Sequence, residues 1–88
     1  MPASQQVPAH VSLSWAISPE TGVAGYVVYR SEQVAARGIK MNENLLGSPT
    51  YRDLSVAPGG RYFYSVTAVD GAGQESPPSA AVEAQIPQ

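Results

Sequence analysis

Strict alternation of apolar and small polar residues is the feature that most constrains the fold of this chain. The run V-S-L-S-W-A-I, residues 11–17, alternates large apolar residues with Ser or, once, Ala. A period of two matches a β-strand with one face buried and one in solvent, and it does not match a helix. The sequence therefore predicts a half-buried antiparallel strand whose core-facing residues are Val11, Leu13, Trp15 and Ile17.

Five further segments have the composition or the alternation of strands. They are residues 25–30, a short edge strand near 39–41, and residues 50–54, 61–70 and 79–86. Gly and Pro clusters supply turns between them. The stretch 31–47 is predicted to be a loop that leads to the edge strand and then brings Leu45 and Leu46 back under the sheets. No segment has a convincing helical pattern, so the sequence predicts an all-β sandwich.

Alternation also assigns faces to the last two strands. In residues 61–70, the set expected to face inward is Tyr62, Tyr64, Val66 and Ala68. The polar members of the other set assign it to solvent: Phe63, Ser65, Thr67 and Val69. In residues 79–86 the inward set is Ala80, Val82, Ala84 and Ile86. The structural core is thus expected to include Trp15, Tyr62, Tyr64 and Val66, whereas alternation does not orient residues 25–30, where both faces are apolar.

Length and charge limit the possible functions. The 88 residues suffice for one domain, expected over residues 7–88 after a polar lead-in at 1–6. The net charge is −2 and the five basic residues are scattered, which argues against nucleic acid and against an anionic membrane surface. No apolar run is long enough for membrane insertion. With no cysteine, the redox compartment cannot be inferred.

Several motifs in combination resemble the fibronectin type III domain, in its bacterial form. Val11-x-Leu13-x-Trp15 resembles its B strand, and residues 25–30 resemble its C strand. Tyr51-x-Asp53-Leu54 resembles its E strand, and Pro58-Gly59-x-x-Tyr62-x-Tyr64-x-Val66 its F strand. Gly73-Gln74-Glu75-Ser76-x-x-Ser79 is similar to its F–G hairpin.

This resemblance implies an immunoglobulin-like β-sandwich of seven or six antiparallel strands, with A, B and E in one sheet and C, C′, F and G in the other. It also implies that Tyr26 and Val28 point inward, and that Val27 and Tyr29 point outward. Only ten residues precede Val11, so the A strand is expected to be short or partly missing. One sheet edge would then be exposed, and exposed edges invite pairing with a neighbour.

The resemblance further implies a non-catalytic structural or interaction module. The module would act as a spacer or protein contact domain of a larger, secreted or cell-surface bacterial protein, in an extracellular, periplasmic or surface location. Its partners would be neighbouring domains or another protein, and chain ends at opposite poles would suit a spacer. The alternative is a ligand-binding module for carbohydrate or protein, with carbohydrate weakly supported because only two aromatic residues, Tyr29 and Phe63, are available on the outward face.

Few residues are candidates for chemistry. Gly71-x-Gly73-x-x-Ser76 has a spacing like that of a dinucleotide loop, but Pro77-Pro78 follows, so a hairpin is expected instead of a helix. Asp70 and Glu75 supply two of the roughly six to eight oxygen ligands that Ca²⁺ needs, so solvated turn carboxylates are expected. We predict no cofactor and no metal.

Catalysis is not expected either. His10, the only histidine, is expected at a strand edge, because no Ser–His–Asp arrangement or nucleophile elbow accompanies it. Asp53 is expected to be a capping or turn residue, since no partner acid or base is evident near it. We therefore predict no catalytic residue.

One outward stripe is a candidate contact surface, formed by Val27, Tyr29, Phe63 and Val69. Cross-strand neighbours lie about 4.5–5.5 Å apart, so these side chains would form one patch. The favoured interpretation is an ordinary sheet face of β-formers. The other is a surface that binds an adjoining domain or a partner. Tyr62 is expected to form a tyrosine corner, with its hydroxyl bonded to backbone in the 54–59 connection.

Overall fold

The computed structural model describes residues 9–17, 22–34 and 36–88. Their regular structure consists of strands alone. The strands are β1 (Val11–Ser14), β2 (Val23–Ser31), β3 (Ile39–Lys40), β4 (Thr50–Asp53), β5 (Arg61–Asp70) and β6 (Val82–Gln85). No helix in these ranges could cross a membrane. The expected lead-in, residues 1–6, lies outside the described residues.

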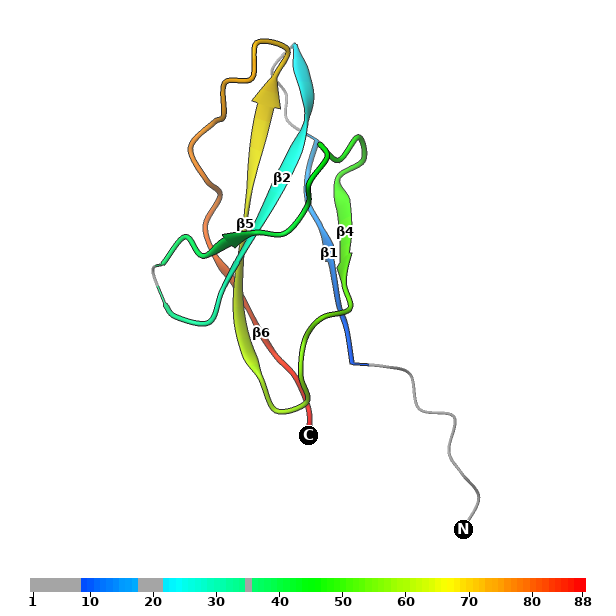
Figure 1. The fold of residues 1–88 in the computed structure, drawn as a ribbon, viewed down its shortest axis with the longest axis vertical. Helices are drawn as coiled ribbons and strands as arrows, with labels where there is room; N and C mark the ends of the chain where they lie inside the picture. Colours follow the sequence, from blue (N-terminus) through cyan, green and yellow to red (C-terminus); the bar gives the residue numbers. More distant parts are fainter. Residues whose placement is uncertain (1–8, 18–21, 35) are drawn as a thin grey trace, which may run out of the picture.

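The strands form two antiparallel layers (Figure 1). One sheet pairs β1 with β4, and the other has the order β3-β2-β5-β6. This is the predicted β-sandwich, and the described residues form six of the seven or six strands that were predicted. The strand pairs β1–β4 and β2–β5 place Val11 opposite Asp53 and Val28 opposite Val66.

The main core lies between the layers, where the alternation predicted it. Val28, Val56, Tyr62, Tyr64 and Ile86 are buried there. Trp15, Val66 and Leu13 are partly buried and pack against that cluster. Trp15 also contacts Tyr26, itself buried, edge to face with ring centroids 5.5 Å apart. Aromatic pairs prefer this arrangement.

Several expected inward residues are not covered. Ile17 is 71% exposed because β1 ends at Ser14, so its alternation does not extend that far. Val82 is 57% exposed although it lies opposite the buried Tyr64, because the two-stranded sheet does not reach over β6. Ala80 and Leu45 are exposed as well, whereas Leu46 packs against the core as expected.

Strand β6 is shorter than the predicted strand over residues 79–86. Before it, two serines make the hydrogen bonds to β5 that a regular strand would make. Pro77 and Pro78 have no N–H to donate. Ser76 and Ser79 donate backbone N–H groups to β5 carbonyls at 2.8 and 2.9 Å, and their hydroxyls accept from two β5 amides. The chain therefore stays attached to β5 through a stretch that cannot form a continuous strand.

Both described ends of the chain lie at one pole of the sandwich (Figure 1). Val11 is opposite Asp53, just before the connection 54–60. Gly59 donates to the carbonyl of Ile86 at 3.0 Å, and Ile86 donates to Gly60 at 2.8 Å. The expectation about the two chain ends falls on the first eight residues, which lie outside the described part.

Candidate functional site

The predicted outward stripe is not an exposed surface. Val27 is 2%, Tyr29 9% and Val69 8% exposed, and together they form a second buried cluster on the outer face of the sheet. Phe63 alone remains half-buried. Thr67, which was expected in solvent, is also buried. The strands do present these side chains on the outward face, but loops from both ends of the sheet cover that face.

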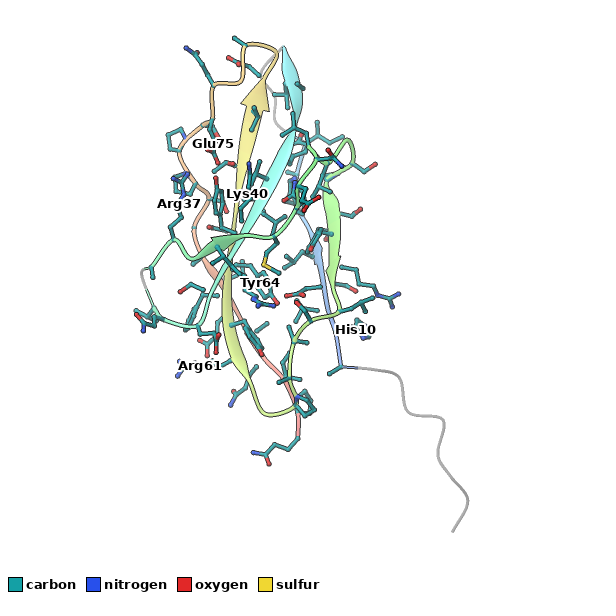
Figure 2. The ribbon with its side chains drawn as sticks, viewed as in Figure 1. His10, Arg37, Lys40, Arg61, Tyr64 and Glu75 are labelled. Carbon is teal, nitrogen blue, oxygen red and sulfur yellow. The ribbon has the colours of Figure 1, made fainter. Side chains whose placement is uncertain are left out.

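Arg37 and Glu75 hold this cover in place (Figure 2). The Arg37 guanidinium lies 4.4 Å from the centre of the Tyr29 ring, and Arg37 forms an ion pair with Glu75 at 3.4 Å. Glu75 accepts hydrogen bonds from the hydroxyls of Tyr29 and Thr67, the latter at 2.6 Å. These hydrogen bonds from Thr67 and Tyr29 lower the pKa of Glu75, and Arg37 lowers it further.

An open groove of about 620 Å³ lies beside the ion pair of Arg37 and Glu75. Its lining mixes one ion pair with serines and small apolar residues, and comprises Ala36, Arg37, Ser65, Glu75, Ser76, Pro77, Pro78, Ser79 and Ala81. Among the described residues, the lining contains no histidine, no cysteine and no aromatic side chain. The groove therefore offers neither a nucleophile–base pair nor a stacking platform for a sugar ring.

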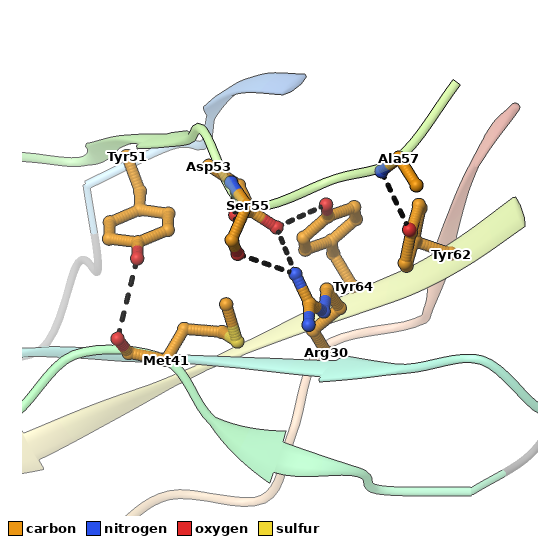
Figure 3. A network of polar contacts seen from close by, with 8 residues as sticks. All are labelled: Arg30, Met41, Tyr51, Asp53, Ser55, Ala57, Tyr62 and Tyr64. Carbon is orange, nitrogen blue, oxygen red and sulfur yellow. Dashed lines mark hydrogen bonds and ion pairs between the residues drawn. The ribbon is translucent and has the colours of Figure 1, made fainter. Parts of the chain in front are cut away.

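A buried polar network joins the two sheets, and sequence reasoning missed it (Figure 3). Asp53, at the end of β4, is 2% exposed. One of its oxygens accepts from Arg30 of β2 at 2.9 Å and from the Tyr64 hydroxyl of β5 at 2.7 Å. The other accepts from the backbone N–H and hydroxyl of Ser55 at 2.9 and 2.7 Å. Asp53 is thus a turn residue, as expected, and also the anchor of an ion pair between sheets.

The electrostatics of Asp53 follow from this set of donors. Burial raises the pKa of the carboxyl, but the hydrogen bonds from Ser55, Tyr64 and Arg30 outweigh burial and lower it to about 2. Burial and the bond to Asp53 raise the pKa of Tyr64. Asp53 is therefore ionised over the physiological range, and a carboxylate with so low a pKa is a weak proton acceptor.

Tyr62 adds a second tie at the same pole. Its hydroxyl accepts from the backbone N–H of Ala57 at 2.9 Å, within the connection where the tyrosine corner was predicted. Gly60 makes this possible, because a Cβ there would lie 2.7 Å from the Tyr62 ring. Arg30 stacks on Tyr62 with 5.0 Å between its guanidinium carbon and the ring centre. The connection 54–60 is thus fixed to the four-stranded sheet.

The arrangement of sheets and core matches a known structure. No family model matches the chain. A solved Fn3-like protein from Clostridium thermocellum superposes with a TM-score of 0.79 and 31% identity, over 92% of this chain and 80% of that chain. The chain belongs to the fibronectin type III-like family. In this module β1 to β6 correspond to strands B, C, C′, E, F and G.

Curated proteins similar to the module are much longer. An amylopullulanase from Thermoanaerobacterium saccharolyticum is 39% identical over 66 residues, which is 75% of this chain. An amylopullulanase from Thermoanaerobacter thermohydrosulfuricus is 39% identical over 74 residues, or 84% of the chain. The module spans about 5% of the length of each.

The remaining candidate residues of the module have structural surroundings. Asp70 accepts from the backbone of Ala72 and Gln74 at 2.9 and 2.8 Å, and Gly73 has φ of 85°, as a tight hairpin requires. His10 immediately precedes β1, far from Arg37 and Glu75 (Figure 2). Among the described residues, no three carboxylates or histidines are grouped as metal ligands.

Proposed function

We propose that this Fn3-like module is a non-catalytic structural and contact unit of a larger, secreted or cell-surface bacterial protein. Its similarity to short segments of amylopullulanases supports this, since about 95% of each of those enzymes lies outside the match. Its partners in this proposal are the neighbouring domains of the same protein, or another protein chain.

The observation that carries the proposal is how the reactive side chains are used. Asp53, Arg30 and Tyr64 link the two sheets through one part-buried and one buried hydrogen bond. Arg37 and Glu75 fasten two loops over the outer face. The polar groups of these side chains already bond to other protein groups and hold the sheets and loops in place. This favours a rigid unit over a reacting centre.

The carbohydrate alternative is less well supported than the sequence indicated. Sugar recognition needs exposed aromatic faces flanked by polar groups. Tyr29 lies beneath Arg37, and Phe63 is half-buried with the Arg61 guanidinium carbon 5.4 Å from its ring centre. The outer face of the described strands therefore lacks the pair of open rings that such a site would use.

Pullulan, the polysaccharide in the relatives' name, gives a direct test. The purified chain should release no reducing ends from pullulan above a heat-denatured control, and its mobility should be unchanged in a native gel that contains pullulan. Hydrolysis by the chain alone, or retardation in the gel, would overturn the proposal.

A second experiment tests the role within an enzyme. Removal of the matched segment from the Thermoanaerobacterium amylopullulanase should leave kcat on pullulan unchanged and accelerate thermal inactivation. Grafting this chain into the gap should restore the inactivation rate. A deleted enzyme that folds but loses kcat would contradict a non-catalytic role.

A further inference from the structure

Arg37 bridges the open groove on the outer face of the four-stranded sheet (Figure 2). Ala36 and Arg37 reach the groove from the connection between β2 and β3, and Glu75 reaches it from the segment after β5. Among the described residues, no other hydrogen bond or ion pair joins residues 36–38 to residues 75–81. In this part of the chain, one side chain therefore ties the two segments together.

Atom Oε2 of Glu75 holds three groups at once. It accepts hydrogen bonds from the hydroxyls of Tyr29 and Thr67, and it forms the ion pair with Arg37. Arg37 also lies over the ring of Tyr29, and that residue is only 9% exposed. The titratable groups that act on this carboxylate are Tyr29 of β2, Arg37, and Lys40 of β3. The cover over Tyr29 thus depends on the negative charge of Glu75.

A proton on Glu75 would act differently on these three groups. A hydroxyl can donate or accept, so the hydroxyls of Tyr29 and Thr67 can rotate and accept a hydrogen bond from a protonated carboxyl. A guanidinium has donors only, and Arg37 would lose its counter-charge. Protonation of Glu75 therefore releases Arg37, while the segment after β5 keeps its bonds to the sheet.

The contacts that hold Arg37 are weak enough to be switched. Its side chain is 53% exposed and that of Glu75 is 30% exposed, and ion pairs this accessible contribute little to stability. A cation–π contact at an exposed site is of similarly modest strength. Gly38, with φ of 81°, follows directly, and β3 begins at Ile39. Hinges are commonly a few residues at the end of an element, so Arg37 can move while β3 stays paired.

We propose that Arg37 is an acid-released latch: when Glu75 takes up a proton, Arg37 leaves the Tyr29 ring and residues 36–38 lift from the outer face. Tyr29 lies opposite Ser65 on the neighbouring strand, and Ser65 lines the groove. Release therefore adds an aromatic wall to a groove whose described lining has none. This inference is independent of the accessory role proposed above, because it rests only on contacts of the outer face.

NMR spectra of the whole chain, recorded as a function of pH, test the latch. Hydrogen bonds from Thr67 and Tyr29 hold the pKa of Glu75 below its ordinary value of 4.5, and Arg37 and Lys40 lower it further. The latched form has the lower pKa, so Arg37 should stay on the ring above pH 4.5 and leave it as the pH falls through that lower pKa. Protons over an aromatic face are shifted upfield. The side-chain protons of Arg37 should therefore move to unstructured values with the midpoint of the Glu75 carboxyl carbon.

Two matched variants identify the group responsible. Glu75→Gln keeps an amide oxygen for the two hydroxyls but carries no charge, so Arg37 should be off the ring at every pH. Trypsin needs a free Arg side chain, and it should cleave after Arg37 roughly five-fold faster in this variant than in the unaltered chain. Glu83→Gln breaks a similar arrangement on the same face, where Arg61 lies 5.4 Å from the centre of the Phe63 ring, and it should change neither measurement.

Three results would overturn the proposal. One is a set of Arg37 resonances that are already at unstructured values at neutral pH. Another is an upfield shift that persists down to about pH 2, where the Ser55 amide reports the titration of its acceptor, Asp53. The third is the same midpoint in Glu75→Gln as in the unaltered chain. The first two are measured on the unaltered chain, so they decide the question even if Glu75→Gln does not fold.

Discussion

Replacement of Asp53 by Asn removes the charge at the centre of the inter-sheet network and keeps the side-chain shape. The carboxylate accepts four hydrogen bonds, from Arg30, Tyr64 and twice from Ser55. An amide nitrogen in place of one oxygen would face donors and could accept from none of them. Arg30, whose side chain is only 14% exposed, would lose its counter-charge.

The expected loss of stability can be worked from the pKa of Asp53. A fall from the ordinary 3.8 to about 2 corresponds to about 2.5 kcal/mol of preference for the charged form, at roughly 1.36 kcal/mol per pKa unit. The mismatched amide adds roughly 1 kcal/mol. Asp53→Asn should therefore lower the free energy of unfolding by about 3.5 kcal/mol, within the range for breaking a buried pair. For a domain of this size, that lowers Tm by roughly 15 °C.

Urea unfolding followed by the fluorescence of Trp15 measures this change, because that indole is partly buried against the core. Arg52→Gln, one residue away on the exposed side of β4, is the matched control and should cost less than about 0.5 kcal/mol. A cost below about 1 kcal/mol for Asp53→Asn would show that the network does not hold the sheets together.

The same carboxyl predicts a pH dependence of definite sign. Its pKa is lower in the folded chain than in the unfolded chain, so the unfolded state binds more protons between the two values. The stabilisation is complete above the unfolded value near 3.8 and is lost as the pH falls to about 2. Within that window, Asp53→Asn should flatten the fall of stability with acid by up to about 1.4 kcal/mol per pH unit. Equal slopes in both proteins would contradict the assignment.

Three further substitutions test other parts of the fold. Tyr62→Phe should cost about 1–3 kcal/mol in a melting experiment, because the N–H of Ala57 loses its acceptor; an unchanged melting curve would refute the tyrosine corner. Gly38→Ala should lower the free energy of unfolding more than Gly22→Ala does. Both positions have positive φ, but only at position 38 would the added Cβ lie 1.9 Å from a carbonyl oxygen, that of Arg30. Equal unfolding free energies of the two variants would contradict this. Ser79→Ala should cost about 1 kcal/mol and speed exchange of the Val66 amide, whose acceptor it removes; unaltered exchange would show that the serine does not replace the ladder.

The parts of the fold that follow from local pattern were accessible from sequence. Alternation in β1 and β5 placed Leu13, Tyr62 and Tyr64 toward the core, and Gly and Pro marked the turns. Alternation failed on the outer face of β5. A serine and a threonine there indicated solvent, but Thr67 is buried because its hydroxyl bonds to Glu75 from the following loop.

The candidate site depended on contacts between distant residues, which a single sequence does not reveal. Arg30 and Asp53 are 23 residues apart and come from different sheets. Arg37 and Glu75 meet only because loops at two corners of the sheet fold over the same ring. The signal that was available is that an Arg and an Asp occur within or next to apolar strands, where an unpaired charge would be costly.

The shared pole of the described chain ends has a mechanical consequence. Tension applied between His10 and Gln88 would act where β1 and β6 begin to separate from their neighbours, Asp53 and Arg61. The hydrogen bonds of each ladder would then be loaded one after another, as in a zipper, and not all at once in shear. A module loaded at these two residues would therefore open at a smaller force than one whose ladders are loaded in shear.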